Sequence, residues 1–302
     1  MQKIVPHLWF DTEAREAADF YTRIFPGSRI VSSTVLKNTP DGDCDVLAFN
    51  LSGHDFMAIS AGPVFTINPS ISFFVNFDPS RDDRARDNLD ALWGELADGG
   101  TALMPLGEYP FSSHYGWVQD RYGVTWQLML TNPAGDPRPF IVPSMMFTRE
   151  NNNRAEEAMD FYQSVFSDAR AGTLARYPEK TGSIEEGSLM FADFMIENQW
   201  FGIMDSGFEH PFTFNEAVSL LVNCDDQDEI DDYWEKLSAD PAAEQCGWCK
   251  DRFGVSWQIS SAAMSDMMGN GTREQIDGVT QAFMPMKKIV IADIEAAYRA
   301  AR

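Results

Sequence analysis

A motif that the chain carries twice ends each time in glutamine. One copy runs from Gly116 to Gln127 and the other from Gly247 to Gln258, with the shared pattern Gly-Trp-x-x-Asp-Arg-aromatic-Gly-Val-x-Trp-Gln. The alternation around each glutamine predicts a strand with an apolar face and a polar face, and the glutamine lies on the polar face. An amide can donate and accept hydrogen bonds but brings no charge to a divalent cation. The polar face is therefore a candidate binding surface and a poor metal site.

The first strand candidate, residues 3–10, adds an imidazole and an indole. If His7 points to the polar side, alternation places Trp9 beside it, with Leu8 on the opposite face. The matching segment 140–147 has Ser144 where the first copy has His7. A histidine that is not duplicated does not support two equal metal sites, so we take these residues as candidates for ligand binding.

Two further polar candidates lie close together in the second half. Asp205 ends a strand candidate, and His210 follows in the loop 207–211. We expect His210 to reach the same polar face as Asp205, although a surface loop is the simpler interpretation. Any metal would then rest on His7 with Gln127 in the first half and on Asp205 with Gln258 in the second.

The elements that must position these side chains also occur twice. Each half is predicted to contain a strand, a helix and three strands, followed by a strand, a helix and about three strands. The fifth strand of each half offers Ser72 or Ser219 to the polar face. Helix starts are predicted at Ser80, at Asp226 with Glu229, and at Thr272 with Gln275.

This duplication sets the expected domain boundaries. Residues 1–131 form the first domain and 140–262 the second, each closing its own cup of polar residues. Residues 132–139 are the linker, because prolines and a glycine prevent a regular element there. Residues 263–302 have no counterpart in the first half and are predicted to form a helical tail that packs across a domain or subunit surface.

Composition excludes several classes of function. The chain has 302 residues, 46 acidic and 23 basic, and a net charge of −23. Nucleic acid and anionic membranes are disfavoured as partners, because both need clustered lysine and arginine. The acidic surface alone leaves adaptation to salt open. No signal peptide or membrane-spanning run is visible, so we expect a cytoplasmic protein. Four cysteines do not make a disulfide framework, and Cys246 with Cys249 is interpreted as two isolated core thiols.

At this point the sequence resembles a known family. Two β-α-β-β-β modules per domain are the arrangement of the vicinal oxygen chelate superfamily of glyoxalase I, bleomycin-resistance proteins and extradiol dioxygenases. The chain looks most like the PhnB-like branch. The segments that carry the resemblance are Ile4 to Asp11, Phe20-Tyr21, Phe214 to Ser219, Tyr233 to Leu237, Cys246 to Trp248, Asp251 to Gln258 and Met284 to Ile289.

The resemblance implies an α+β fold in which each pair of modules forms a cup-shaped sheet. Enzymes of the superfamily hold a divalent metal in the cup with His, Gln or Glu ligands, and the last-strand ligand, usually Glu, matches Gln127 and Gln258. Members of the branch are often described as 3-demethylubiquinone methyltransferases. The chain lacks the glycine-rich loop between strand and helix that nucleotide-type cofactors use, and we discount that activity.

We therefore expect a protein that binds a small, partly apolar molecule without a complete metal site and with no cofactor. The candidate binding residues are His7, Trp9, Gln127, Ser144, Asp205, His210 and Gln258. The alternative is a metal-dependent lyase, isomerase or dioxygenase of the glyoxalase type with unusual ligands, or a metal-free acid–base enzyme that uses His7 or His210. A third possibility is an assembly role, with a homodimer formed through the C-terminal helices.

Overall fold

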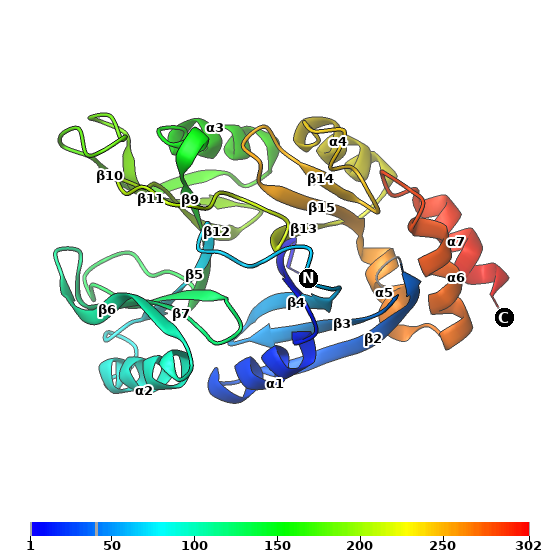
Figure 1. The fold of residues 1–302 in the computed structure, drawn as a ribbon, viewed down its shortest axis with the longest axis horizontal. Helices are drawn as coiled ribbons and strands as arrows, with labels where there is room; N and C mark the ends of the chain where they lie inside the picture. Colours follow the sequence, from blue (N-terminus) through cyan, green and yellow to red (C-terminus); the bar gives the residue numbers. More distant parts are fainter. Residues whose placement is uncertain (1, 40–41, 302) are drawn as a thin grey trace. The chain divides into compact units, whose positions relative to one another are not determined.

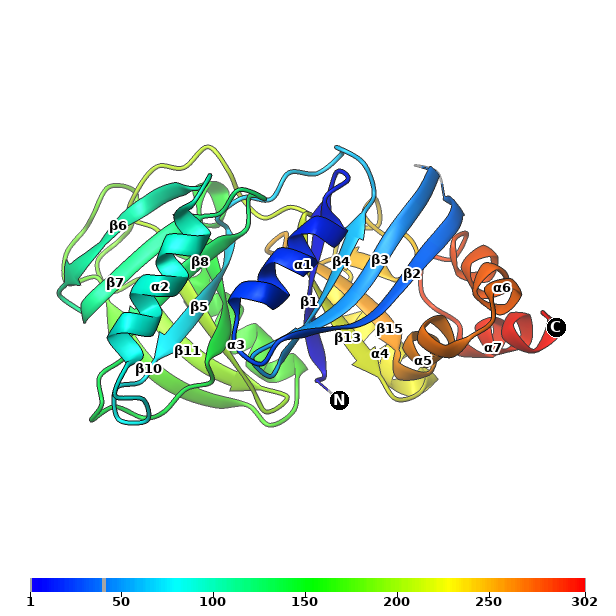
Figure 2. The same ribbon diagram turned by 90° about the horizontal axis from the view of Figure 1, so that it is seen from below.

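The computed structural model describes residues 2–39 and 42–301, and these form two compact units. Unit 1 contains residues 1–67 and 215–302, and unit 2 contains residues 68–214. Each unit is built on one curled sheet with helices on its outer face (Figures 1 and 2). The fold is therefore α+β, as the sequence predicts.

Unit 1 takes its strands from both ends of the chain. The N-terminal part supplies β1 (Ile4–Phe10), α1 (Ala14–Ile24), β2 (Arg29–Thr39), β3 (Gly42–Leu51) and β4 (His54–Ser60). The C-terminal part supplies β13 (Val218–Cys224), α4 (Gln227–Leu237), β14 (Trp248–Lys250) and β15 (Ser256–Ser261). The sheet order is β14-β15-β13-β1-β4-β3-β2.

Unit 2 is continuous in sequence. It begins with β5 (Ile71–Phe77), α2 (Ala85–Ala97), β6 (Thr101–Tyr109), β7 (Ser112–Gln119) and β8 (Thr125–Leu130). It continues with β9 (Ile141–Phe147), a 3₁₀ turn (Arg149–Asn151), α3 (Ala155–Val165), β10 (Arg170–Arg176), β11 (Leu189–Ile196) and β12 (Gln199–Asp205). The sheet order is β10-β11-β12-β9-β5-β8-β7-β6.

The modules therefore pair differently from the expectation that each repeat closes its own cup. Strand β1 pairs antiparallel with β13 of the other repeat, and β5 pairs antiparallel with β9. Each repeat contributes one module to each unit. The expected pairs His7 with Gln127 and Asp205 with Gln258 are wrong, because the two members of each pair lie in different sheets.

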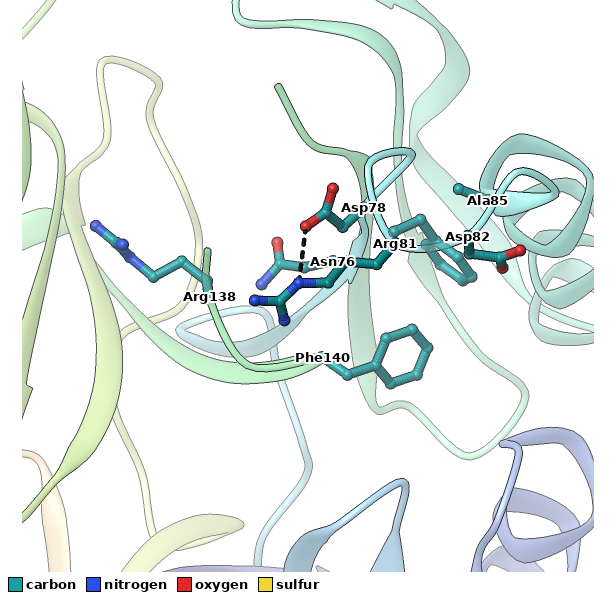
Figure 3. A pocket seen from close by; sticks show the side chains of 8 residues that line it. Asn76, Asp78, Arg81, Asp82, Ala85, Arg138 and Phe140 are labelled. Atoms are coloured by element: carbon teal, nitrogen blue, oxygen red, sulfur yellow. Dashed lines mark ion pairs between the residues drawn. The ribbon is translucent and has the colours of Figure 1, made fainter. Parts of the chain in front are cut away.

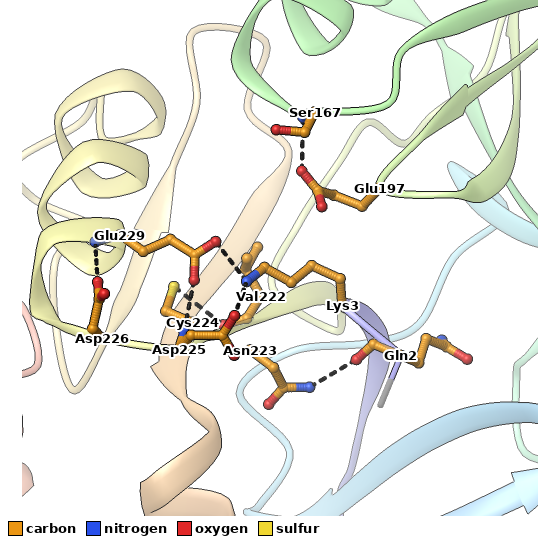
Figure 4. A network of polar contacts seen from close by, with 10 residues as sticks. All are labelled: Gln2, Lys3, Ser167, Glu197, Val222, Asn223, Cys224, Asp225, Asp226 and Glu229. Atoms are coloured by element: carbon orange, nitrogen blue, oxygen red, sulfur yellow. Dashed lines mark hydrogen bonds and ion pairs between the residues drawn. The ribbon is translucent and has the colours of Figure 1, made fainter.

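Polar contacts secure the join between the two ends of the chain in unit 1 (Figure 4). Asn223 on β13 donates its backbone N–H to Lys3 O at 2.9 Å and its side-chain amide to Gln2 O at 3.1 Å. Lys3 Nζ lies 2.6 Å from Glu229 Oε1 on α4. Because Lys3 is mostly buried, this ion pair fixes the start of β1 against the helix of the partner module.

The tail forms three helices, α5 (Ala262–Asn270), α6 (Arg273–Phe283) and α7 (Ile291–Ala300). They pack within unit 1, with α5 against both β15 and β2 (Figure 2). Thr34 on β2 donates its hydroxyl to Met268 O at 3.1 Å. The tail thus covers its own unit.

A segment of the tail also takes the place of an edge strand. In unit 2, β6 pairs with β7 at the sheet edge, whereas the described part of unit 1 has no strand in the position of β6. Instead, Cys246 N donates to Met286 O and Gly247 N donates to Lys287 O, both at 2.7 Å. The Cys246 thiol donates to Met284 O at 3.0 Å, and Cys249 is buried in the core.

Helix starts follow the sequence in part. Asp226 accepts the backbone N–H of Glu229, and Thr272 forms a full capping box with Gln275, as predicted. The prediction for Ser80 is wrong: α2 begins at Ala85, and the Ser80 hydroxyl donates to Asp78 Oδ1 at 2.6 Å. The acidic side chain two residues earlier competes for the hydroxyl, so it forms a local turn instead of a cap.

Candidate functional site

The face of each sheet that lies away from helices α1–α4 is called here cup A in unit 1 and cup B in unit 2. In cup A, Gln258 on β15 donates its amide to Ser219 Oγ on β13 at 2.9 Å. Ser219 is the cross-strand partner of His7 on β1. Three side chains from three adjacent strands therefore meet at the floor of cup A, although two of them are separated by most of the chain.

His7 is buried in this floor, with 4% of its surface exposed. Its Nδ1 has no hydrogen-bond partner among the described residues. Burial lowers the His7 pKa to about 4, because the apolar surroundings disfavour the charged imidazolium. His7 is thus neutral near pH 7, and one buried ring nitrogen is available to a ligand or water.

Aromatic rings surround His7. The ring of Trp248 on β14 lies edge-on to His7 at 5.7 Å and to Trp9 at 6.2 Å, and Phe65 packs on Trp9 at 5.1 Å. Trp9 donates its indole N–H to Gly62 O at 2.8 Å, which fixes its orientation. Apart from the buried floor, the inner face of unit 1 is lined by half-buried side chains, namely Trp9, Val46, Ala48, Met57, Ile59, Trp248 and Gln258.

Cup B repeats the glutamine–serine pair but completes it differently. Gln127 donates to Ser72 Oγ at 2.7 Å and accepts the hydroxyl of Tyr115 at 2.6 Å. Ser144 stands opposite Ser72 across the strands, where His7 stands in cup A, and its buried Oγ has no described partner. Both ends of the Gln127 amide are therefore occupied by the protein itself.

A compact apolar cluster fills the rest of the inner face of unit 2. Its buried members are Phe74, Tyr115, Val142 and Trp200. Packed against them are the partly buried side chains of Met104, Tyr109, Trp117, Met129, Phe191, Met195 and Met204. Arg138 of the predicted linker stacks on Trp200 at 3.8 Å and forms a two-point ion pair with Asp193, at 2.6 and 3.2 Å.

The aspartates of the repeated motif have a structural role. Asp120 Oδ1 accepts the N–H groups of Tyr122 and Val124, and its Oδ2 accepts the Trp126 indole N–H at 2.8 Å. Asp251 makes the same three bonds to Phe253, Val255 and Trp257. The glycine in each turn has φ of +89° or +83°, which disfavours any other residue. The motif is thus a clasp that aligns the last strand.

Asp205 does not lie on the polar face with a glutamine. Its carboxylate accepts the backbone N–H groups of Arg154 and Ala155, at 3.1 and 3.2 Å, at the start of α3. Ser60 makes the equivalent contact with Ala14 N in unit 1. Burial raises the Asp205 pKa to about 6, although backbone hydrogen bonds act in the opposite direction. Asp205 therefore serves as a helix cap on the outer face.

His210 interacts within its own loop. Its Nε2 lies 2.6 Å from Ser206 Oγ, and its ring packs against Phe212 at 4.8 Å. None of these contacts involves Gln127 or Ser72. The structure therefore brings together His7, Trp9 and Gln258 in one unit and Ser144 and Gln127 in the other, and leaves Asp205 and His210 outside both groups.

Sequence reasoning missed two residues that define the cups, Trp248 and Tyr115. Trp248 precedes the second motif's aspartate and pairs directly with Gln258 across the strands, and Trp117 pairs in the same way with Gln127. Each tryptophan precedes its glutamine by the same number of residues in the sequence. This equal spacing predicts the pairing once β7 and β14 are treated as antiparallel neighbours of the last strands. The Tyr115 hydroxyl gave no such signal, because its counterpart is Cys246.

The donors in the cups do not fit a catalytic divalent metal site. Cup A offers one imidazole, one amide and one hydroxyl, and cup B offers no imidazole at its floor. Such sites usually need about three His or carboxylate ligands. Within residues 2–39 and 42–301, no group of three or more His, Cys, Asp or Glu side chains could hold a metal ion.

A pocket of about 220 Å³ lies elsewhere in unit 2 (Figure 3). It is at the end of β5 away from Ser72, and Asn76, Arg81, Arg138 and Phe140 are among the residues that line it. Its arginines are already paired, Arg81 with Asp78 at 3.4 Å and Arg138 with Asp193. None of the predicted site residues lines this pocket.

Comparison with known proteins identifies the fold and the repeats. A family model described as 3-demethylubiquinone-9 3-methyltransferase matches residues 2–129 and 139–260. A Bacillus cereus protein, provisionally described as a 3-demethylubiquinone-9 3-methyltransferase and PhnB protein, is 38% identical. That similarity covers 43% of this chain and 100% of that one, with a TM-score of 0.39. No curated protein matches the chain.

Two larger structures share the fold. Glyoxalase I from Zea mays is 12% identical with a TM-score of 0.53, over 90% of this chain and 97% of that one. A protein provisionally described as a dioxygenase from Bacillus subtilis is also 12% identical, with a TM-score of 0.50, over 87% and 89% of the two chains. Among the described residues, no helix is both long and apolar enough to cross a membrane.

Proposed function

Because the chain belongs to the family described as 3-demethylubiquinone-9 3-methyltransferase, the PhnB-like branch of the vicinal oxygen chelate superfamily, we propose that it binds a small, partly apolar molecule on the inner face of a curled sheet. Binding sites of this kind are largely apolar, with a few polar groups that orient the ligand. The observation that carries the proposal is the glutamine–serine pair at the floor of each cup, beside aromatic side chains.

The methyl-transfer activity in the family description is not part of this proposal. Nucleotide-type cofactors bind where a glycine-rich turn joins a strand to a helix, because the backbone must approach the cofactor closely. The strand-to-helix connections at residues 11–13, 78–84, 148–154 and 225–226 lack glycine, and β15 runs directly into α5. The comparison with glyoxalase I is a likeness of fold and carries no activity to this chain.

A metal-dependent lyase, isomerase or dioxygenase is the weaker candidate, because the donors at the cup floors are neutral and few. Elemental analysis of the purified protein separates the two functions. A stoichiometric divalent metal that is lost in Gln258→Ala or Gln127→Ala would replace the binding proposal with the metal enzyme.

The binding proposal itself is tested by a screen that does not depend on a chosen ligand class. A chemically diverse fragment library is added to the full-length chain, and thermal stabilisation is measured, since a ligand that binds only the folded state raises its stability. Hits are then checked by protein-detected NMR on the backbone amides of β1, β5, β8 and β15. If no fragment stabilises the protein, or if the hits perturb only other elements, the proposal fails.

The expected homodimer through the C-terminal helices is also open to a direct test. Light scattering on the eluted protein at micromolar concentration gives the mass of the species in solution. A mass of one chain would exclude this mode of assembly. In the described structure, α5 and α6 both pack on β2 of their own unit.

A further inference from the structure

The two cups have the same origin but differ in how their polar groups are used. In cup B, Gln127 bonds Ser72 and Tyr115, so its amide has a partner at both ends. In cup A, Gln258 bonds only Ser219 through its amide nitrogen, and its Oε1 has no partner among the described residues. The difference arises because Cys246 stands where Tyr115 stands in the other repeat, and its thiol is directed to Met284.

The cups also differ in the size of the side chains that line them. Strand pairing matches the members of the cluster on β5, β8, β9, β11 and β12 with residues of cup A, and the repeated motif matches those on β7. Five bulky residues, Phe74, Tyr115, Phe191, Trp200 and Met129, correspond to Leu221, Cys246, Val46, Asp55 and Ser260. The large side chains thus form a continuous apolar cluster around four buried members in cup B, whereas in cup A half-buried Trp9, Met57 and Trp248 surround a polar floor.

Charge further restricts what cup A can accept. Its lysine, Lys250, is already paired with Glu216 at 2.8 Å, and both side chains are mostly buried. His7 is neutral near pH 7. A carboxylate or phosphate would therefore find no unpaired cation at the floor among the residues that the structure describes, and the net charge of −23 opposes its approach. An uncharged ligand needs no cation at the floor and is not repelled by the net negative charge.

We propose that cup A is the binding cup of the pair and that its ligand is an uncharged planar molecule whose hydroxyl group donates a hydrogen bond to Gln258 Oε1. The planar body lies against Trp9 and Trp248, whose rings meet edge to face at an interplanar angle of 79°, and His7 supplies a second polar contact beside Ser219. Cup B serves as the core that holds unit 2 together. This inference rests on the proposed function and assigns it to one of two similar surfaces.

Three matched probes test the ligand chemistry. 2-Naphthol carries the ring and the donor, 2-methoxynaphthalene the ring with an acceptor alone, and 2-naphthoate the ring with a charge. Dissociation constants are measured by calorimetry on the full-length chain, with tryptophan quenching as a second readout. We expect 2-naphthol to bind about tenfold or more tightly than the other two, the usual effect of one hydrogen bond lost to a buried group.

Paired variants test which cup is used. Gln258→Leu and His7→Ser, the second of which copies the residue of the other repeat, are expected to weaken 2-naphthol binding about tenfold each. Gln127→Leu makes the same change in cup B, and the inference requires it to weaken 2-naphthol binding less than Gln258→Leu does. Circular dichroism and urea unfolding establish that each variant is folded before binding is compared.

Each remaining outcome has a defined meaning. Weaker binding in Gln127→Leu with unchanged binding in Gln258→Leu would assign the ligand to cup B and overturn the inference, while the proposed binding function stands. Tighter binding of 2-naphthoate, or no binding of any probe, would overturn the ligand class. The fragment screen decides independently whether the protein binds small molecules at all.

Discussion

At the scale of single residues, the repeated motif serves folding more than binding. Its aspartate accepts two backbone N–H groups and one indole N–H in both copies, while its first tryptophan and its final glutamine lie on the inner face. The aspartate clasp is thus needed by the fold in both units. The residues that differ between the copies, such as His7 against Ser144, distinguish the two cups as candidates for binding.

The clasp gives a stability prediction. Asp251 is buried, and replacement by alanine leaves three buried donors without a partner. We expect Asp251→Ala to lower the free energy of unfolding by about 3 kcal/mol. Urea unfolding followed by tryptophan fluorescence measures the change. Asp19→Ala, at an exposed position of α1 in the same unit, is the control and should change stability by less than about 0.5 kcal/mol.

The raised pKa of Asp205 predicts how the free energy of unfolding changes with pH. Its pKa in the folded protein is about 6, above the value of about 4 expected in the unfolded chain, so the folded state binds more protons. The stability contributed by Asp205 is complete below pH 4 and is lost as the pH rises through 6. Asp205→Asn keeps an acceptor for the helix N–H groups but does not titrate.

The comparison of wild type with Asp205→Asn isolates this effect. Relative to wild type, the variant should gain up to about 2 kcal/mol between pH 4 and pH 7. Urea unfolding of both proteins across that range gives the difference directly. A constant difference would show that the carboxyl group is already ionised at pH 4. Asp205→Ala removes the acceptor and should cost about 2 kcal/mol at pH 4.

Sequence patterns predict a side chain's face better than its partner. Alternation correctly places Gln127 opposite Trp126 and His7 opposite Leu8. The expectation for Asp205 is wrong for the same reason: Met204 lies on the inner face, so Asp205 points to the outer face and accepts N–H groups at the start of α3. The hydroxyl of Tyr115 on Gln127 depends on a residue that only one repeat carries.

At the scale of elements, the tail completes a sheet that lacks an edge strand. Met286 and Lys287 accept the N–H groups that β6 would satisfy in unit 2. Ile289 is 1% exposed and lies beside Gly247, where an added Cβ would approach its side chain to 3.1 Å. This contact holds the tail against the edge of the sheet.

Loosening that contact should expose a thiol. We expect Ile289→Ala to cost about 3 kcal/mol through the cavity it leaves, and to increase the rate at which Cys246 reacts with a disulfide reagent. Val290→Ala, at the adjacent exposed position, is the control for both measurements. The added reactivity must vanish in the double variant with Cys246→Ser. Reactivity that persists there would come from another cysteine.

Short-range signals explain which element boundaries were predictable. The caps Asp226 and Thr272 lie within three residues of their partners, so the sequence alone determines them. The edge formed by Met286 and Lys287 joins residues far apart along the chain and has no periodic pattern. A pattern within a short segment of the sequence therefore cannot predict it.

At the scale of the whole molecule, the two repeats exchange modules. β1 joins β13 and β5 joins β9, so neither repeat contains both halves of a sheet. The repeats themselves, the α+β class and the family follow from the sequence, because they depend on local pattern and similarity. The pairing of modules does not follow from the sequence, because β1 and β9 have almost the same residue pattern. Pairing within one repeat and pairing between repeats would therefore bury similar faces.

Module exchange predicts how fragments behave. Residues 68–214 contain the whole of unit 2, and we expect this fragment to fold alone with a cooperative urea transition. Residues 140–262, which form one sequence repeat, contain β9 without β5 and β13 without β1, and should remain largely unfolded. Circular dichroism and amide dispersion in NMR distinguish the two. A folded 140–262 fragment would show that modules of one repeat can also pair.

The interrupted chain of unit 1 has a consequence for synthesis. Strands β1 to β4 leave the ribosome first, but the strand that covers the free side of β1 is made only after all of unit 2. Unit 2 can complete its fold in the meantime, while one edge of the apolar strand β1 remains unpaired. Slow translation or a lack of chaperones should therefore harm the N-terminal module first, and the last step to finish should be the closing of β13 onto β1.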